Sequence, residues 1–361
     1  MNLLIITQKV DKNDPILGFF HSWIIEFSRH YSNVSVVCLE SGEYNLPNNV
    51  EVYSLGKKDL KPQTSNLKLF AKIKYVVAFL KYIFRNRRKY DEVFVHMNPI
   101  YVVLAGVMWR ILGKKVGLWY THREVDLKLR IATKLVNHIF TASEYSFNIK
   151  SEKVHIVGHG ILADRFTAHT KRSESEVFKV LYVGRLTRIK NLDVLIKATD
   201  LLRDKTDKSF IVELIGDAIS EDDKKYQKEL FEFVREKNLH RFVSFLGAIS
   251  NEKMPKYYTE ADVSVNLSPT GGVDKAVLES LLSGTPAFVS NQAFEDYYGR
   301  YWDDLSFKEV DAGDLSDKIA KYINKNEENK ITLSSALMKK VQEKSNLENL
   351  IVKISSLLRT G

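Results

Sequence analysis

The stretch that decides the fold runs from Val263 to Ser290 and reads VSVNLSPTGGVDKAVLESLLSGTPAFVS. It begins with a β-branched run, Val263–Leu267, and continues through a turn that contains two adjacent glycines. A segment of helical period, Lys275–Ser283, follows, and a second apolar run, Pro286–Ser290, closes the stretch. Two strands joined by a helix predict a right-handed βαβ unit in which the strands are parallel.

The same alternation of short apolar runs and longer helix-period segments fills the rest of the chain. Further strands are predicted at Leu3–Thr7, Val34–Leu39, Val50–Leu55, Glu92–Met97, Lys115–Tyr120, Asn137–Ala142, Phe178–Val183, Phe210–Ile215 and Phe242–Leu246. Further helices are predicted at Phe19–His30, Leu67–Arg87, Tyr101–Leu112, Asn191–Arg203, Glu221–Glu236, Glu252–Glu260, Asn329–Lys344 and Asn346–Arg359. This order predicts an α/β fold whose parallel sheets are covered by helices on both faces.

The chain is longer than one hydrophobic core usually supports. Its 361 residues exceed the roughly 250–300 at which chains divide into domains. The polar segment Ala163–Glu176 interrupts the strand–helix pattern, which then restarts. We therefore expect a first α/β domain at residues 1–165, a second at 166–345, and a last helix at 346–361 that could pack back on the first domain. Ligands of such sheets lie at the carboxyl ends of strands, here also between the domains.

The net charge of +9 belongs to the first half of the chain. Residues 1–165 hold 24 Lys+Arg and 14 Asp+Glu, whereas residues 166–361 hold 30 and 31. Within the first half, Leu60–Tyr90 contains nine Lys or Arg and no Asp or Glu. Such a surface can meet nucleic acid, an anionic membrane or an acidic substrate. The single cysteine, Cys38, cannot form an internal disulfide, which favours a reducing compartment.

A cationic loop follows the first predicted strand of the second half. Gly184 ends the strand Phe178–Val183, and Arg185 and Lys190 precede a helix for which Asn191 is a suitable N-cap. Glycine allows a close turn, and two cations beside a helix N-terminus suit a diphosphate. The alternative is that both cations are ordinary surface residues, which follow strands in many α/β proteins.

The opening stretch supplies a second group of candidates. The backbone N–H groups of Gly271 and Gly272 can face an anion. A carboxylate at Glu279, one turn into the helix, can accept both hydroxyls of a ribose. Gly216 ends another strand and leaves room for a flat base. In the competing interpretations, Gly271 and Gly272 form an ordinary turn, Glu279 is a solvated helix acid, and Gly216 marks the start of a loop.

In this order and spacing, these segments resemble the retaining glycosyltransferases of the GT-B fold, family 4 type, also described as group 1. Gly184-Arg185-Leu186 with Lys190-Asn191 is similar to the phosphate-binding stretch of that family, and Leu278–Pro286 is similar to its ribose-binding helix and the strand beyond. The resemblance covers about Phe178–Ser290 in detail and the first half only in layout. It implies two Rossmann-like domains that face each other across a cleft.

The resemblance also implies an activity. A sugar would pass from a nucleotide-diphosphate sugar, UDP- or GDP-linked, to a hydroxyl of a glycan or lipid-linked acceptor, as in cell-surface polysaccharide or glycolipid synthesis. No other cofactor is expected. The first domain would bind the acceptor and the second domain the nucleotide sugar.

One departure from the family pattern affects the donor side. The family usually has two glutamates separated by seven residues; Glu279 matches the second, and the first falls on Gly271. The missing acid lies by the donor sugar in the family, so its loss bears on donor identity and on catalysis. Asp274 and Lys275 are nearby polar groups that could take over part of its role.

The resemblance assigns roles in the first half as well. In the loop before Phe19–His30, Gly18 is the candidate for close backbone approach to the donor phosphates. His21 and Trp23 could contact the acceptor, although packing of the helix start on the loop explains both equally. His122 follows a predicted strand, at a place where family members often have a histidine near the donor sugar; an ordinary loop histidine is the alternative.

No Asp-x-Asp triplet, which the GT-A class uses to hold a metal ion, follows any predicted strand. We therefore expect no metal ion, and charge neutralisation by Arg185 and Lys190 instead. With His122, these two cations form the predicted catalytic set. The acceptor hydroxyl would attack the sugar from the face that the diphosphate leaves, with retention of configuration.

Three rival functions remain open at this point. A non-catalytic nucleotide-sugar-binding or scaffold protein of the same fold is the main one, given Gly271. A sugar-nucleotide epimerase is another, and a nicotinamide-dependent oxidoreductase is disfavoured because no G-x-G-x-x-G follows the first strand.

The basic segment predicts an amphipathic helix with an apolar stripe on one side. Lys74, Lys81, Arg85 and Arg88 recur on another face and are the candidate contacts with an anionic membrane. Solvated cations on a helix that packs on its sheet are the alternative. Nucleic acid is not expected, because no binding motif or exposed aromatic platform accompanies the cations. These patterns favour a cytoplasmic protein at the inner face of the cell membrane.

Overall fold

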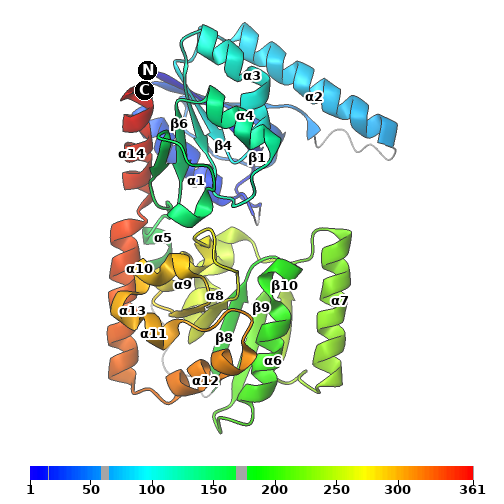
Figure 1. The fold of residues 1–361 in the computed structure, drawn as a ribbon, viewed down its shortest axis with the longest axis vertical. Coiled ribbons are helices and arrows are strands. Elements are labelled where there is room, and N and C mark those ends of the chain that lie inside the picture. The colour runs from blue at the N-terminus through cyan, green and yellow to red at the C-terminus, as the bar shows by residue number, and fades with distance from the viewer. Residues whose placement is uncertain (15, 58–64, 168–176, 361) are drawn as a thin grey trace. The chain divides into compact units, whose positions relative to one another are not determined.

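The computed structural model describes residues 1–14, 16–57, 65–167 and 177–360 (Figure 1). The chain forms two units: Met1–Gly160 together with Leu347–Gly361, and Ile161–Asn346. Most of the polar segment between the expected domains, residues 168–176, lies outside the described residues, as do residues 60–64 of the acid-free stretch. Each unit is an α/β domain with a parallel sheet, which confirms the predicted fold class.

A seven-stranded sheet forms the centre of the first unit, in the order β3-β2-β1-β4-β5-β6-β7. Its strands are β1 (Asn2–Val10), β2 (Asn33–Ser41), β3 (Val50–Ser54), β4 (Glu92–His96), β5 (Lys115–Trp119), β6 (His138–Thr141) and β7 (Val154–Ile156). The chain reverses its direction of winding at β1, where Leu3 lies between Val34 of β2 and Glu92 of β4. Because all pairs are parallel, the carboxyl ends of the strands share one edge of the sheet.

Helices cover both faces of this sheet. One apolar cluster joins its strands to α2 (Ser65–Arg85), α3 (Ile100–Ile111) and α4 (Leu127–Leu135), through buried side chains such as Phe79, Trp109 and Leu129. The opposite cluster joins the strands to α1 (Phe19–His30) and α14 (Leu347–Thr360). The sheet is therefore buried on both sides, as its nearly continuous apolar strands require.

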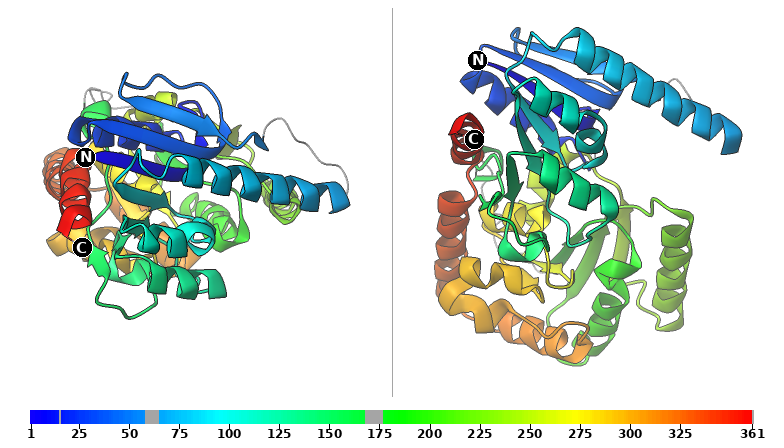
Figure 2. Two further views of the ribbon diagram at one scale, coloured as in Figure 1. Left: turned by 90° about the horizontal axis from the view of Figure 1, so that it is seen from above. Right: turned by 45° about the horizontal axis from the view of Figure 1, so that its top comes forward.

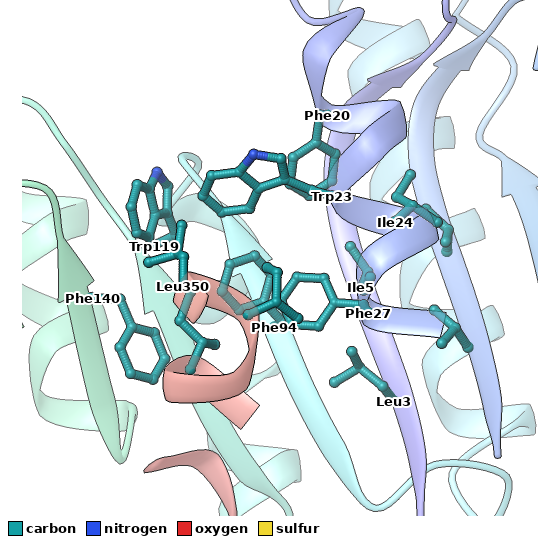
Figure 3. Close-up of a cluster of buried hydrophobic side chains, with 14 of the residues drawn as sticks. Leu3, Ile5, Phe20, Trp23, Ile24, Phe27, Phe94, Trp119, Phe140 and Leu350 are labelled. Atoms are coloured by element: carbon teal, nitrogen blue, oxygen red, sulfur yellow. The ribbon is translucent and has the colours of Figure 1, made fainter. Parts of the chain in front are cut away.

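The last helix of the chain completes the core of the first unit. Figure 3 shows Leu350 of α14 beside Phe94 and Phe140, in the cluster that also holds Trp23 and Trp119. Two glycines make room for this helix. A Cβ at Gly117 would lie 2.8 Å from Leu358 and 2.6 Å from the Phe140 ring, and one at Gly160 would lie 2.6 Å from Leu350.

The second unit has a five-stranded parallel sheet in the order β10-β9-β8-β11-β12. Its strands are β8 (Phe178–Val183), β9 (Phe210–Ile215), β10 (Val243–Gly247), β11 (Val263–Asn266) and β12 (Ala287–Val289). Its helices are α5 (Asp164–Thr167), α6 (Leu192–Leu202), α7 (Glu221–Glu236), α8 (Met254–Glu260), α9 (Lys275–Leu282), α10 (Glu295–Tyr298), α11 (Trp302–Leu305), α12 (Ala312–Ile323) and α13 (Glu327–Lys344). The stretch Val263–Ser290 forms β11, α9 and β12, with β11 and β12 paired in parallel as predicted.

Two helices of ordinary length were missing from the sequence prediction. α4 begins with Asp126 as N-cap, whose carboxylate accepts the N–H of Leu129 at 2.8 Å. α12 begins in the same way with Asp311 and buries Leu315 and Ile319. α4 buries only Leu129, Ala132 and Thr133, so its cap was the stronger sequence signal, whereas the buried residues of α12 recur at helical spacing and agree with its cap.

The position of α14 leads to a stability prediction. Ile354 is fully buried in the cluster of Figure 3, so replacing it with alanine leaves a cavity. We expect Ile354→Ala to lower the free energy of unfolding of the first unit by about 2–4 kcal/mol, measured by urea denaturation. Val352→Ala on the exposed side of the same helix is the control and should change it by less than about 0.5 kcal/mol. Equal effects of the two substitutions would show that α14 does not contribute to this core.

Candidate functional site

The ends of β8 and β9 are in backbone contact. Gly184 follows β8 and donates its N–H to the carbonyl oxygen of Ile215 at 3.0 Å. Gly216 follows β9 with φ +139°, and a Cβ there would lie 1.9 Å from the carbonyl oxygen of Gly184. The close approach of the two strand ends therefore already requires glycine at position 216, which was predicted to leave room for a nucleotide base.

The loop after β8 carries the two predicted phosphate-binding cations. Leu186 is buried and anchors this loop, while the side chain of Arg185 is exposed. Asn191 precedes α6 in the left-handed region, with φ +47°. Its side chain does not cap the helix as the sequence suggested; it donates to the carbonyl oxygen of Leu267 at 3.2 Å and so ties the loop to the end of β11.

Lys190, at the end of this loop, is the centre of a polar network. Its Nζ lies 2.9 Å from Oδ2 of Asp274 and donates to Oγ of Ser268 at 2.6 Å. Asn266 donates to the same Asp274 oxygen at 2.9 Å, and Ser268 donates to it as well. Asp274 stands at the N-cap position of α9, but its carboxylate is turned to these partners and makes no cap hydrogen bond.

The electrostatics of Asp274 follow from this network. Burial opposes ionisation, but the charge of Lys190 and the hydrogen bonds from Ser268, Lys190 and Asn266 outweigh it. The pKa of Asp274 is therefore lowered below its ordinary value, and its carboxylate is ionised near neutral pH.

Glu279, the residue predicted to hold a ribose, is engaged within its own unit. Its side chain is 5 % exposed, and Oε2 accepts a hydrogen bond from the hydroxyl of Tyr258 at 3.1 Å. Nζ of Lys275, one turn earlier on α9, lies 2.5 Å from Oε1. Burial, with the charge of Glu279, raises the pKa of Tyr258, which keeps this hydroxyl a donor. A ribose could reach Oε1 only if Lys275 turned away.

The double-glycine loop does not present its first N–H to an anion. The amide of Asn291, a fully buried residue just after β12, holds both glycines: Oδ1 accepts the N–H of Gly271 at 3.3 Å, and Nδ2 donates to the carbonyl oxygen of Gly272 at 2.8 Å. For Gly271, the prediction of a free donor is therefore wrong, because a side chain from the next strand end already uses this group.

In the first unit, Gly18 is explained by its own loop. It stands before α1, and a Cβ there would lie 2.5 Å from the carbonyl oxygen of Asp14 and 2.8 Å from that of Lys12. The loop folds back on itself at this point, so glycine is needed whether or not a ligand approaches.

Trp23 is a core residue, which corrects its assignment to the acceptor. Its ring is 1 % exposed, packs edge-on against Trp119 at 4.9 Å, and donates through Nε1 to the carbonyl oxygen of Gly160 at 3.3 Å (Figure 3). His21 is half-buried, and its Nε2 accepts the backbone N–H of Asn45 at 3.1 Å. Burial lowers the pKa of His21, so its ring is neutral near pH 7 and acts as a loop anchor.

Two histidines stand at strand ends of the same sheet edge. His122 follows β5 and is exposed, as a ligand-contacting residue must be. His96 ends β4 and was not singled out from the sequence; it is 2 % exposed, stacks on Phe20 at 4.0 Å, and has Nδ1 at 3.3 Å from the hydroxyl of Thr7. Burial lowers the pKa of His96 to about 3, so it is neutral.

The basic segment forms α2, but its apolar residues divide between two environments. Lys74, Lys81, Arg85 and Arg88 are exposed, which both the membrane interpretation and the solvated-cation alternative require. Phe79 and Ile83 form the buried side of the helix, whereas four other apolar residues are exposed: Phe70, Ile73, Val77 and Phe84. Among the described residues, no helix has the length and hydropathy to cross a bilayer.

The strand-end residues that sequence reasoning missed in the second unit share one signal. Asn266, Ser268 and Asn291 are all small polar residues at the carboxyl end of β11 or β12. Side chains at this edge meet across the sheet, so polar residues there were predictable participants even though their partners were not.

Comparison with known proteins gives this edge a context. Residues 164–336 match the family "Glycosyl transferases group 1". The matched residues all lie in the second unit and cover most of it. An uncharacterized glycosyltransferase of Methanocaldococcus jannaschii is 27 % identical to this chain over 156 residues, and the mannosylfructose-phosphate synthase of Agrobacterium fabrum is 24 % identical over 153. Each alignment covers 40 % of this chain, and 38 % and 34 % of those relatives, so the chain spans less than half the length of either relative.

Solved structures extend the likeness to the whole fold. Anabaena HepE in complex with UDP and glucose has a TM-score of 0.76 at 16 % identity, with 99 % of each chain covered. Sucrose-phosphate synthase from Thermosynechococcus elongatus has a TM-score of 0.78 at 16 % identity, covering 99 % of this chain and 98 % of its own. The chain therefore has the GT-B fold, and the residues that match the group 1 family lie in its second unit.

The Lys190–Asp274 pair of the second unit gives a pH-dependent prediction. Because the folded pKa of Asp274 is lowered, the stability from the pair is present above the unfolded value near 3.9 and is lost as pH falls through the folded value. We expect Asp274→Asn to lower the free energy of unfolding by about 1–3 kcal/mol at pH 7, and the difference from wild type to shrink between pH 5 and pH 3. Asp207→Asn, at an exposed position, is the control. A difference that stayed constant with pH would exclude an ionised Asp274 as its source.

Proposed function

We propose that this protein is a glycosyltransferase that moves a sugar from a nucleotide-diphosphate sugar, UDP- or GDP-linked, to a hydroxyl of a glycan or lipid-linked acceptor. The observation that supports it is the Lys190–Asp274 ion pair, which joins the loop that carries Arg185 to the start of the helix that carries Glu279, within the residues that match the group 1 family. Anabaena HepE, which shares the fold, has been solved with UDP and with UDP-glucose, which supports a uridine nucleotide as the first donor to test.

The charges at this edge suit a departing diphosphate. Asp274 and Glu279 are each compensated by a lysine, Lys190 and Lys275. Arg185 is exposed, and among the described residues no carboxylate pairs with it. The site therefore offers a positive charge to an anion without leaving a buried carboxylate to repel it. Donors fixed in advance stabilise developing charge without reorganisation, which is the usual source of catalysis in transfer reactions.

The reaction that we propose retains configuration and uses no metal ion. The bond between the anomeric carbon and the diphosphate oxygen breaks, and its electron pair stays on the diphosphate, beside Arg185 and Lys190. The acceptor oxygen bonds to the anomeric carbon from the same face. Its proton passes to the diphosphate oxygen that has just left, which is the nearest base on that face.

The ribose and the sugar would use α9. Tyr258 fixes Oε2 of Glu279, so the carboxylate is oriented before a ligand arrives. A ribose hydroxyl that bonds to Oε1 of Glu279 would displace Lys275 from this oxygen. The displaced lysine stands at the start of α9, four residues after Gly271, the position at which the family's first acid is absent. We propose that the released Lys275, with Asp274, contacts the donor sugar or its phosphate in place of that acid.

The first unit would bind the acceptor. His122 is exposed at the carboxyl end of β5, where it can hydrogen-bond a sugar hydroxyl. The exposed cations Lys74, Lys81 and Arg85 of α2, with Arg88 beyond its end, support a peripheral position at the inner face of the cell membrane. A lipid-linked acceptor for cell-surface polysaccharide or glycolipid synthesis would be met there.

A second candidate function is a non-catalytic nucleotide-sugar-binding protein. Position 271, where the family has its first acid, carries no side chain, and its backbone is held by Asn291. Hydrolysis of the donor in the absence of acceptor separates the two: an enzyme releases nucleoside diphosphate slowly, and a binding protein does not.

The role of Arg185 can be tested against a neighbour in the same loop. A thermal-shift screen with UDP-, GDP-, ADP- and CMP-sugars first identifies the donor. With that donor, Arg185→Ala should lower kcat by about 100- to 1,000-fold, because it removes one cation from the developing charge. Arg188→Ala is the matched control, since Arg188 pairs with Glu229 of α7 at 2.5 Å, and it should change kcat by less than about threefold. Equal rates in wild type and Arg185→Ala would exclude the proposed phosphate site.

The role of Lys275 predicts a separate kinetic effect. Lys275→Ala leaves Glu279 able to accept a ribose but removes the cation proposed to replace the family's first acid. We expect kcat/KM for the donor to fall by about tenfold or more, with Lys253→Ala, at an exposed position, as the control. If Lys275→Ala and Asp274→Ala both left turnover unchanged, neither residue would be a substitute for that acid.

A further inference from the structure

The helix α2 carries a stripe of exposed apolar side chains. Phe70, Ile73, Val77 and Phe84 are 74 %, 51 %, 58 % and 59 % exposed. Their spacings of three, four and seven residues place them on one side of the helix. The buried side of α2 is a different one, formed by Phe79 and Ile83 in the core of the first unit. The four residues, called here the α2 stripe, are therefore not needed to hold α2 on its sheet.

Cations border the α2 stripe. Lys74 and Lys81 lie one turn after Phe70 and Val77, and Arg85 lies one turn after Lys81. All three are exposed, and no Asp or Glu occurs between residues 60 and 90. The stripe thus has cations along one border and no acid with which they could pair within the helix.

The neighbouring helix α3 also carries exposed apolar and basic side chains. α3 packs beside α2 on one face of the sheet, and both helices end at the edge where the parallel strands begin (Figures 1 and 2). At that end of α3, Ile111 is 80 % exposed and Arg110 is exposed as well. At the other end, the first turns of α2 project beyond α3 in both figures.

We propose that α2 lies in the plane of an anionic membrane surface, with the α2 stripe inserted among the acyl chains and Lys74, Lys81 and Arg85 against lipid phosphates. This inference rests on the membrane position proposed above and adds its mode: insertion of named side chains, not adsorption of cations alone. It is the arrangement of an interfacial amphipathic helix, which has an apolar face bordered by lysine and arginine.

Charge favours lipid over another protein chain as the occupant. Two copies of this chain that paired through their α2 stripes would bring the cations of both helices together without an acid between them. An anionic lipid surface supplies the opposite charge, and the acyl region beneath it receives the apolar side chains.

Insertion can be detected with a label at the stripe. Cys38 is the only cysteine, is fully buried, and burial raises the pKa of its thiol to about 12, so a Val77→Cys variant can be labelled selectively with an environment-sensitive dye. With vesicles that contain phosphatidylglycerol, we expect its emission to shift to the blue, and the shift to persist after 1 M salt is added to bound protein. Ile331→Cys, an exposed position on α13, is the control and should show no shift.

The same surface can be tested without a label. Ile73→Ser with Val77→Ser should lower the partition coefficient on these vesicles by roughly 10- to 100-fold in a sedimentation assay, because two apolar side chains no longer enter the membrane. Ile331→Ser should leave it unchanged. Thermal melts of all variants check that the exposed substitutions do not unfold the protein.

Three outcomes would overturn the proposal. Binding that salt abolishes, without a blue shift, would mean adsorption by cations only. Sedimentation unaffected by the double substitution would place the contact elsewhere. If the protein formed dimers without vesicles and the double substitution converted them to monomers, the occupant of the α2 stripe would be a second copy of this chain. Donor hydrolysis without vesicles is measured on the same samples; its loss would count against the proposed glycosyltransferase and not against insertion.

Discussion

The ion pair between Lys190 and Asp274 joins the loop after β8 to the start of α9, and the other polar groups at this edge are arranged around it. Ser268 and Asn266, at the end of β11, supply further hydrogen bonds to the same carboxylate. This half-buried carboxylate accepts four hydrogen bonds from three side chains and is held in one position, because loss of Lys190 would leave its charge uncompensated. The pair therefore fixes the distance between two segments that are 84 residues apart in the chain.

The two units differ in how their charges are paired. In the second unit, Asp274 and Glu279 are each paired with a lysine, whereas Arg185 is exposed. In the first unit, Lys74, Lys81 and Arg85 of α2 are exposed, and no acid occurs in their stretch of sequence. One exposed cation beside paired acids suits a small anionic ligand, whereas a row of unopposed cations suits an extended anionic surface.

Periodicity predicted the elements well where the pattern was strong. The bounds of β8 and α7 are those expected from the sequence, since a buried strand and an amphipathic helix with a capping box leave clear signals. The Lys275–Glu279 contact also follows from a spacing of four residues on a helix. Trp23 could not be placed in this way. Its position at the start of a helix allows either a surface or a core role, and the helix that shares its core, α14, comes from the other end of the sequence. The hydrogen bond between the Asn291 side chain and the backbone N–H of Gly271 could not be predicted either. It joins the segments that follow two neighbouring strands, and no local sequence pattern encodes the geometry of such a contact.

The contribution of α14 to the first unit has a consequence for biosynthesis. Met1–Gly160 emerges from the ribosome long before Leu347 is synthesised, and the whole second unit is made in between. During that interval the nascent first unit lacks the helix that covers Phe94 and Phe140, and its strands expose an apolar face (Figure 3). The second unit, being continuous in sequence, can fold on the ribosome as soon as it emerges. The unit that is made first can therefore be completed only after the second unit has been synthesised.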